Sequence, residues 1–183
     1  MGREMLRTKV EQILNMTVLR GVQRHHLFTC LGLLRDIDRQ EMNATYGQDW
    51  NEDLLAKCWT ENQIDGLTFF NEDAPVACVL GWCTSPGHWT CGMVATDDWQ
   101  VIARPASRYL RRHLAPVLAG NRVRRASCVL AADVNEPLRW LKFLGFELEG
   151  RLRRYGVDGQ DFLVLSYLPT LPRKRKELKR VQP

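Results

Sequence analysis

The stretch Asn135-Glu136-Pro137-Leu138-Arg139-Trp140-Leu141-Lys142-Phe143-Leu144-Gly145-Phe146 predicts a short helix with a signal at each end. Asn135 is suited to cap the first free amides, and Pro137 in the first turn gives up an N–H that the helix does not use. Gly145 is expected to end the helix in the left-handed conformation, with Phe146 folding back on the last turn. The stretch therefore predicts a well-delimited helix that leads directly into the next segment.

Two strands are predicted after this helix, over residues 147–157 and 160–168. The dipeptide Asp158-Gly159 between them is a strong signal for a tight hairpin turn. The C-terminal part of the chain is thus expected to be a helix followed by a β-hairpin.

Upstream, apolar periodicity predicts a strand at residues 16–22, an amphipathic helix over 27–41 and a second helix over 50–60. Further strands are expected at residues 67–70, 76–83, 88–95 and 123–131. A helix over 103–119 places leucines on one side and arginines on the other, and Pro116 should bend or end it at a cost of about 3 kcal/mol.

This order of elements and the C-terminal module resemble the GCN5-related N-acetyltransferase (GNAT) family over residues 16–168. The resemblance implies an α/β (α+β) fold with a mixed, mostly antiparallel sheet of six to seven strands, flanked by about four helices. A helix that ends in Gly-Phe before a strand also suits other α/β domains, so the fold and the activity are separate questions.

The resemblance also implies where acetyl-CoA would bind, which is between the family's fourth and fifth strands, with the pyrophosphate at the loop that opens the next helix. The family's loop pattern is Gln/Arg-x-x-Gly-x-Gly/Ala, and the equivalent stretch here is Gln100-Val101-Ile102-Ala103-Arg104-Pro105. Only Gln100 fits well, because the methyl of Ala103 and the missing N–H of Pro105 oppose close approach to a phosphate. The cofactor-binding residues expected on this basis are Gln100, Ala103, Arg104, Arg108 and Asn135, where the arginine side chains replace backbone donors. The expectation is that acetyl-CoA can bind but that no cofactor is required.

Catalytic groups are harder to assign, because the tyrosine that the family commonly places four residues before the Gly of Gly-Phe is Leu141 here. Tyr155, or else Tyr109, is a substitute general acid, and either residue also suits packing. Asp97, Asp98 and His88 are candidate general bases near the end of a strand, and each also suits a turn or a cap. The catalytic set expected is Asp97, Asp98 and Tyr155.

The chain is expected to have three parts: an extension at residues 1–15, expected to be helical, a domain at 16–168 and a basic tail at 169–183, which differs from the rest in its charge. The net charge is +5, and the tail alone accounts for it, so the rest is neutral. The tail is either solvated or a tether to an anionic partner such as nucleic acid; its basic residues are Arg173, Lys174, Arg175, Lys176, Lys179 and Arg180.

The sequence contains no apolar run of about 18 residues, so a soluble, cytosolic protein without a membrane partner is expected. Six cysteines without a Cys-x-x-Cys pair predict reduced, mostly buried thiols. No metal is expected, because Cys83, His88 and Cys91 lack a fourth ligand.

A narrower resemblance is carried by residues 34–42, 75–81, 89–97 and 135–146, which occur in the same order in the internal virion protein A family of tailed phages. It implies a virion or morphogenesis component that uses an acetyltransferase-like scaffold to bind other phage virion or host proteins, in the host cytoplasm or in the virion. Two alternatives stay open: an active acetyl-CoA-dependent N-acyltransferase that modifies a host protein or a small amine, and a nucleic-acid-binding module that acts through the basic tail.

Overall fold

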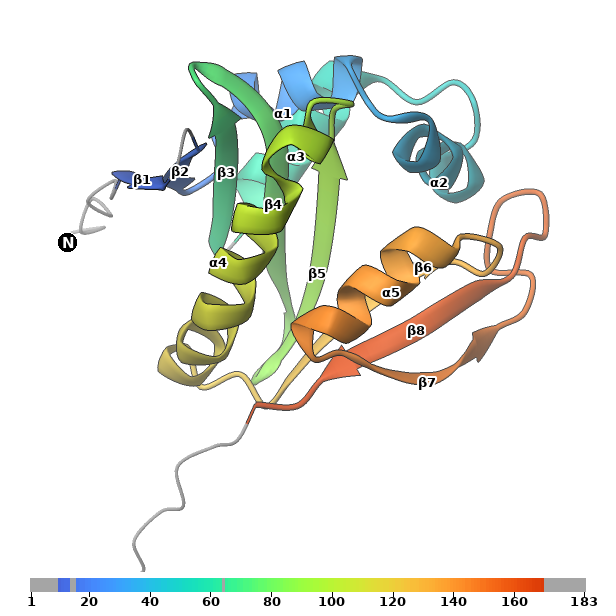
Figure 1. The fold of residues 1–183 in the computed structure, drawn as a ribbon. Coiled ribbons are helices and arrows are strands. Elements are labelled where there is room, and N and C mark those ends of the chain that lie inside the picture. The colour runs from blue at the N-terminus through green and yellow to red at the C-terminus, as the bar shows by residue number, and fades with distance from the viewer. Residues whose placement is uncertain (1–9, 14–15, 64, 170–183) are drawn as a thin grey trace, which may run out of the picture.

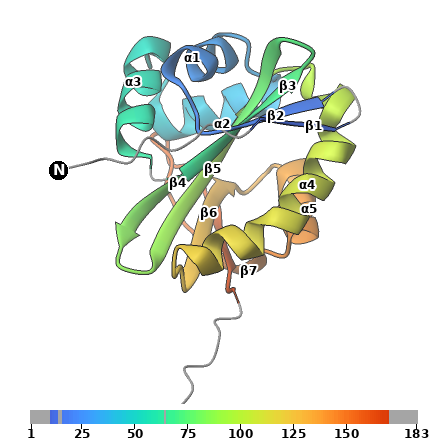
Figure 2. The same ribbon diagram turned by 90° about the vertical axis from the view of Figure 1, so that its left-hand side faces the viewer.

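The computed structural model describes residues 10–13, 16–63 and 65–169, and these form one sheet covered by helices on both sides. The strands are β1 (Val10–Ile13), β2 (Met16–Arg20), β3 (Asp65–Asn71), β4 (Ala74–Ser85), β5 (His88–Ala95), β6 (Arg125–Ala131), β7 (Glu147–Leu152) and β8 (Phe162–Tyr167). The helices are α1 (Arg24–Gly32), α2 (Asp36–Tyr46), α3 (Glu52–Asn62), α4 (Trp99–Gly120) and α5 (Asn135–Leu144). Figure 1 shows α4 and α5 in front of the sheet, and Figure 2 shows α1 and α3 on its other side.

The eight strands lie in the order β1-β2-β3-β4-β5-β6-β8-β7. Among the described residues every neighbouring pair is antiparallel except β5 and β6, which are parallel. This confirms the expected mixed, mostly antiparallel α/β architecture. The sheet gains a strand because Val10–Ile13, which belongs to the extension expected to be helical, pairs with β2 instead.

The helix expected over residues 27–41 is in fact two helices, α1 and α2, separated at residues 33–35. The helix is interrupted there because backbone hydrogen bonds join this part of the chain to the end of β5. Leu34 forms an isolated antiparallel bridge with Thr96, and the Arg35 N–H donates to the carbonyl of Ala95 at 3.0 Å. This break places the first turn of α2 at the end of β5.

The C-terminal end of α5 is built as the sequence predicts. Gly145 has φ +100°, the Phe146 N–H donates to the Leu141 carbonyl at 3.0 Å, and the Gly145 N–H donates to the Lys142 carbonyl at 3.0 Å. This pair of bonds is a Schellman motif, and Phe146 and Leu141 are both buried in the same core cluster.

The N-terminal end of α5 differs from the expectation. Val134 is the N-cap residue, with extended backbone, and Asn135 is already the first helical residue. An N-cap residue needs non-helical backbone for its side chain to accept from the amides of the first turn. Asn135 already has helical backbone, so it does not act as the cap, and its side chain is exposed. Pro137 still lies within the first four positions, where an N–H has no helical acceptor.

Helix α4 is longer than predicted at both ends. It starts at Trp99, so residues 100–105 are helical, and it continues to Gly120, four residues beyond Pro116. Burial of Leu118 against Trp89 and Val123 holds the last turn in place and offsets the cost of the proline. The prediction that this helix has an apolar side and a basic side is confirmed, because Leu110 is buried and the arginines of the helix are exposed.

Strands β7 and β8 pair antiparallel as predicted, but the connection between them runs over residues 153–161 and is longer than a two-residue turn. The Asp161 carboxylate accepts hydrogen bonds from the Arg151 side chain at 2.7 Å and from the Arg154 N–H at 2.8 Å. The Val157 N–H donates to the Ala44 carbonyl at 2.9 Å and attaches the loop to α2.

Candidate active site

The main irregularity of the sheet is a fork between β5 and β6. These parallel strands are in register over only three residue pairs, from His88↔Arg125 to Thr90↔Ser127. Beyond these pairs the two strands diverge, and a cavity of about 270 Å³ lies between them. We call it the fork cavity.

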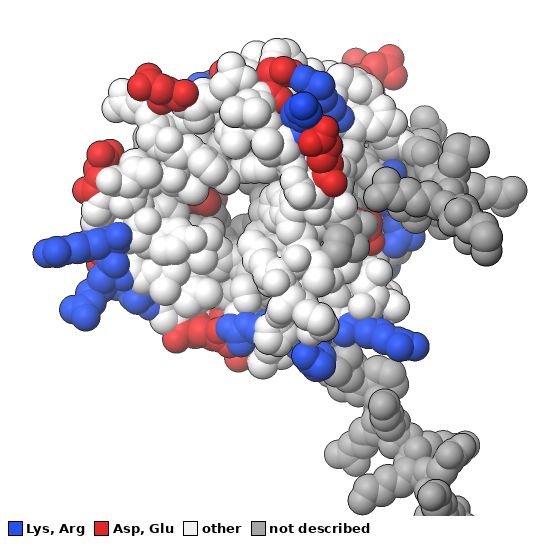
Figure 3. All heavy atoms as spheres, turned by 180° about the vertical axis from the view of Figure 1, so that it is seen from behind, with Lys and Arg blue, Asp and Glu red and all other residues white. Residues whose placement is uncertain are grey.

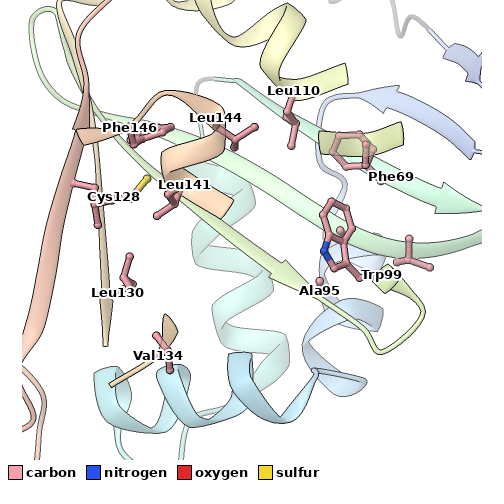
Figure 4. Packing of buried hydrophobic residues seen from close by; sticks show 14 of the residues in the cluster. Phe69, Ala95, Trp99, Leu110, Cys128, Leu130, Val134, Leu141, Leu144 and Phe146 are labelled. Carbon is pink, nitrogen blue, oxygen red and sulfur yellow. The ribbon is translucent and has the colours of Figure 1, made fainter. Parts of the chain in front are cut away.

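Apolar side chains from both strands and from α4 and α5 make up most of the wall of the fork cavity. Figure 4 shows several of them, with Leu141 and Leu144 of α5 beside Cys128 of β6 and with Leu110 of α4 above the sheet. Further lining comes from the apolar residues Val79, Met93, Leu114, Val129, Leu130 and Phe146.

Four charged side chains gather at one end of the fork cavity: Arg35 just before α2, Asp38 and Glu41 of α2, and Glu136 of α5. The Arg35 guanidinium donates to both oxygens of Asp38, at 3.0 and 2.8 Å, and lies 3.7 Å from the Glu136 carboxylate. The Ala95 N–H donates to Asp38 at 2.9 Å. Arg35 and Asp38 therefore join α2 to the end of β5 and, through Glu136, to α5 across the mouth of the fork.

Burial shifts the two acidic groups of α2 toward their protonated forms. Burial raises the pKa of Asp38, although Arg35 and the Ala95 amide act in the opposite direction. The pKa of Glu41 rises to about 7, first through burial and then through the negative charge of Asp38, while the Ala131 backbone and Arg35 partly offset the shift. Glu41 is thus a half-buried carboxyl at the fork cavity that exchanges its proton near neutral pH.

The catalytic residues predicted from the sequence lie elsewhere. Asp97 and Asp98 are exposed in the turn between β5 and α4, and neither lines the fork cavity. Tyr155 is 53% exposed in the connection between β7 and β8 and packs on Phe162, with ring centroids 5.1 Å apart. His88 is exposed at the start of β5. The structure therefore brings none of these four residues to the cavity.

The residues predicted to hold a cofactor are divided between the cavity and the surface. Ala103 lines the fork cavity, whereas Gln100, Arg104 and Arg108 are exposed on α4 and Asn135 is exposed on α5. Most of the cavity wall is apolar, which suits the arm of a thioester such as acetyl-CoA.

The start of α4 is a poor site for a pyrophosphate, in contrast to the cavity. Its first backbone amides already donate to backbone carbonyls. The Trp99 N–H donates to the Thr96 carbonyl at 3.0 Å, the Gln100 N–H to the Asp97 carbonyl at 3.4 Å, and the Val101 N–H to the Asp98 carbonyl at 3.0 Å. The carboxylates of Asp97 and Asp98 beside this helix end would also repel an anion. Arg104 and Arg108 are the nearby side chains on α4 with phosphate-binding chemistry.

Sequence reasoning missed Glu41. The charged residues of the 34–42 segment suggested the solvent side of an amphipathic helix, and nothing in the spacing reveals that the helix breaks at Leu34 and turns Asp38 and Glu41 toward β5 and β6. The nearest signal was the run of closely spaced charges of both signs from Arg35 to Glu41, and such a run is equally typical of a solvent-exposed helix.

The six cysteines of the chain are all free thiols, and three of them are buried: Cys30, Cys78 and Cys128. Over residues 10–13, 16–63 and 65–169, no group of three or more His, Cys, Asp or Glu is arranged to hold a metal ion. No helix in the same part of the chain combines the length and the apolar content needed to cross a bilayer. Residues 170–183, which include all the basic residues of the tail, and residues 1–9 and 14–15 of the extension lie outside the described residues.

Comparison with known proteins identifies the fold through structure alone. No protein-family model matches the sequence, and no curated protein matches it. The ribosomal L7/L12 α-N-protein acetyltransferase in complex with coenzyme A superposes with a TM-score of 0.67 at 11% identity, covering 88% of this chain and 98% of that one. For the ribosomal-protein-S18-alanine N-acetyltransferase from Escherichia coli the TM-score is 0.56 at 17% identity, with 76% and 90% covered. A probable acetyltransferase of the GNAT family from Chromobacterium violaceum gives 0.63 at 14%, with 87% and 90% covered. The chain therefore has the fold of the GCN5-related N-acetyltransferases.

Proposed function

We propose that this chain is an N-acyltransferase that moves an acyl group from a coenzyme A thioester to an amine, with Glu41 as the general base. The observation that carries the proposal is the position of Glu41, a carboxyl with a pKa of about 7 at the end of a cavity between two diverging strands. A base is most effective when its pKa lies near the working pH, because it is then both available and strong enough to take a proton.

The reaction needs one proton acceptor and a place for the thioester. The lone pair of the neutral amine attacks the thioester carbonyl carbon and forms the C–N bond, and the C–S bond breaks when the tetrahedral intermediate collapses. The Glu41 carboxylate takes the proton that the amine nitrogen loses, directly or through a water. The sulfur leaves as a thiolate and takes a proton from solvent, since Leu141 offers none at the position where the family commonly has a tyrosine.

The donor would lie with its arm in the fork cavity, against Ala103 and the apolar side chains of α5. Its phosphates would rely on the side chains of Arg104 and Arg108, because the first amides of α4 are already used. We therefore expect weaker phosphate binding than a free helix N-terminus provides.

The test is the pH dependence of acyl transfer in the Glu41→Gln variant. The unmodified chain should show a rate that rises through about pH 7 as Glu41 loses its proton, and Glu41→Gln should lose that limb and most of the rate, typically 10²-fold or more. Glu61→Gln is the matched control, because Glu61 is exposed at the end of α3. Transfer that keeps the same pH limb in Glu41→Gln would remove Glu41 from the mechanism.

A second candidate function is a virion or morphogenesis component, as the resemblance to the phage internal virion protein A family implies. The observation that favours it is the start of α4, where occupied amides and two aspartates oppose a pyrophosphate. Such a component would use the scaffold to bind other phage virion or host proteins, in the host cytoplasm or in the particle. Calorimetry with coenzyme A separates the two candidates, because one-to-one binding supports the enzyme and the absence of heat supports the binding role. Mass spectrometry of purified particles should find the chain if it is a virion protein.

A further inference from the structure

A second cavity, of about 190 Å³, lies beneath α4. Residues of β3, β4 and β5 make its floor, and the C-terminal half of α4 covers it. We call it the α4 cavity. Residues that line it and not the fork cavity include Leu67 of β3, Trp89 of β5 and Val117 of α4.

The two cavities lie next to each other. Four residues line both: Val79, Cys91, Leu110 and Leu114. Cys91 is the first residue of β5 beyond its register with β6, so the shared wall begins where the strands separate. A group held at the base of the fork therefore lies beside the α4 cavity, with only these four side chains between the two.

Most of the side chains that line the α4 cavity are apolar. The polar members of the lining include Arg20 and Asp65, which form an ion pair of 3.4 Å, and His113, whose ring stacks on Tyr109 with centroids 4.2 Å apart. An apolar cavity of this kind takes up apolar groups in preference to water. Its chemistry suits a hydrocarbon chain.

We propose that the acyl group of the donor thioester is a chain of several methylenes, longer than acetyl, and that this chain lies in the α4 cavity. The inference rests on the proposed function, because it takes the thioester to be held in the fork cavity. The bonds made and broken are those of the transfer above, and the hydrocarbon chain moves with the carbonyl carbon to the amine.

The first test is calorimetry of the unmodified chain with coenzyme A and with acetyl-, butyryl-, hexanoyl- and octanoyl-coenzyme A. Each added methylene that becomes buried should tighten binding roughly fourfold. The same affinity for the acetyl and octanoyl thioesters would overturn the inference while leaving the acyltransferase proposal intact. No binding of coenzyme A or of any thioester would instead overturn the proposed function itself.

The second test fills the α4 cavity. Leu67→Trp should abolish the gain in affinity of octanoyl- over acetyl-coenzyme A. It should not weaken the binding of acetyl-coenzyme A, because Leu67 does not line the fork cavity. Leu54→Trp is the matched control, since Leu54 is 59% exposed on α3 and should keep the full gain. Val117→Phe fills the same space from α4 and serves if Leu67→Trp does not fold. A full gain in a folded cavity-filling variant would place the acyl chain elsewhere and overturn the assignment.

Discussion

Replacing Gly145 by alanine should destabilise the domain for two separable reasons. Gly145 has φ +100°, and a side chain in this left-handed region costs about 1 kcal/mol or more. An added Cβ would also lie 3.0 Å from Cε2 of Tyr167, so this ring, which packs on Phe146, would have to shift by a few tenths of an ångström. A side chain forced off its rotamer costs about 0.5–1.5 kcal/mol. The two terms together predict a loss of about 2 kcal/mol.

Two other glycines separate the backbone term from the contact term. Gly159 has φ +82° with open space around its Cβ position, so Gly159→Ala should lose only the backbone term of about 1 kcal/mol. Gly32 lies in helical backbone with open space as well, so Gly32→Ala should stabilise the chain by about 0.5–1 kcal/mol. Gly145→Val should cost more than Gly145→Ala, because a β-branched residue resists positive φ.

The assay is urea unfolding followed by tryptophan fluorescence, with thermal unfolding as a second measure. For a domain of this size each kcal/mol moves the Tm by about 2–4 °C, so Gly145→Ala should lower it by about 4–8 °C. If Gly145→Ala and Gly159→Ala lose equal free energy, the Tyr167 contact contributes nothing and that part of the reasoning is refuted. If Gly145→Ala is as stable as the unmodified chain, the helix cap itself is misjudged.

Three further predictions concern charge. Glu41 has a pKa of about 7 in the folded chain and an ordinary pKa of 4.5 in the unfolded chain. Between these pH values the unfolded state binds fewer protons than the folded state, so the free energy of unfolding should fall by about 2–3 kcal/mol from pH 4.5 to 7. Urea unfolding at several pH values measures this, and Glu41→Gln should flatten the slope. Arg104→Ala and Arg108→Ala should each weaken coenzyme A binding about tenfold in calorimetry with unchanged Tm, and unaltered affinity in both would leave the phosphates without these partners. Truncation after Leu168 should abolish any salt-sensitive retention on nucleic acid, and retention by the truncated chain would refute a role for the tail.

Much of the fold follows from local signals that the sequence contains. The helix from Asn135 to Leu144 and its glycine end were predictable because the Schellman motif depends on one residue, Gly145, and its immediate neighbours. The start of α3 depends on equally local chemistry, because the Asn51 side chain accepts from the Leu54 N–H at 2.8 Å. Element boundaries that depend on distant contacts were not predictable, such as the break at Leu34, which pairs with Thr96.

The candidate site was less predictable than the fold, because it depends on which helix faces the fork. Asp97 and Asp98 follow a strand directly and so were natural candidates, but their backbone turns them to solvent. Glu41 lies far from the fork in the sequence and reaches it only because α2 is held to the end of β5 by Arg35 and Asp38. Its altered pKa arises from burial, which no local pattern of residues encodes.

The three residue pairs that join β5 to β6 divide the sheet into two antiparallel units, one of strands β1 to β5 and one of β6, β8 and β7. Each unit can form its own ladder, so the seam between them should be the weakest line in the protein toward amide hydrogen exchange. A molecule bound in the fork would bridge both units, and by mass action it would slow the opening of the whole sheet. Exchange rates along β6, measured with and without a thioester, would therefore reveal occupancy of the fork even when no product is formed.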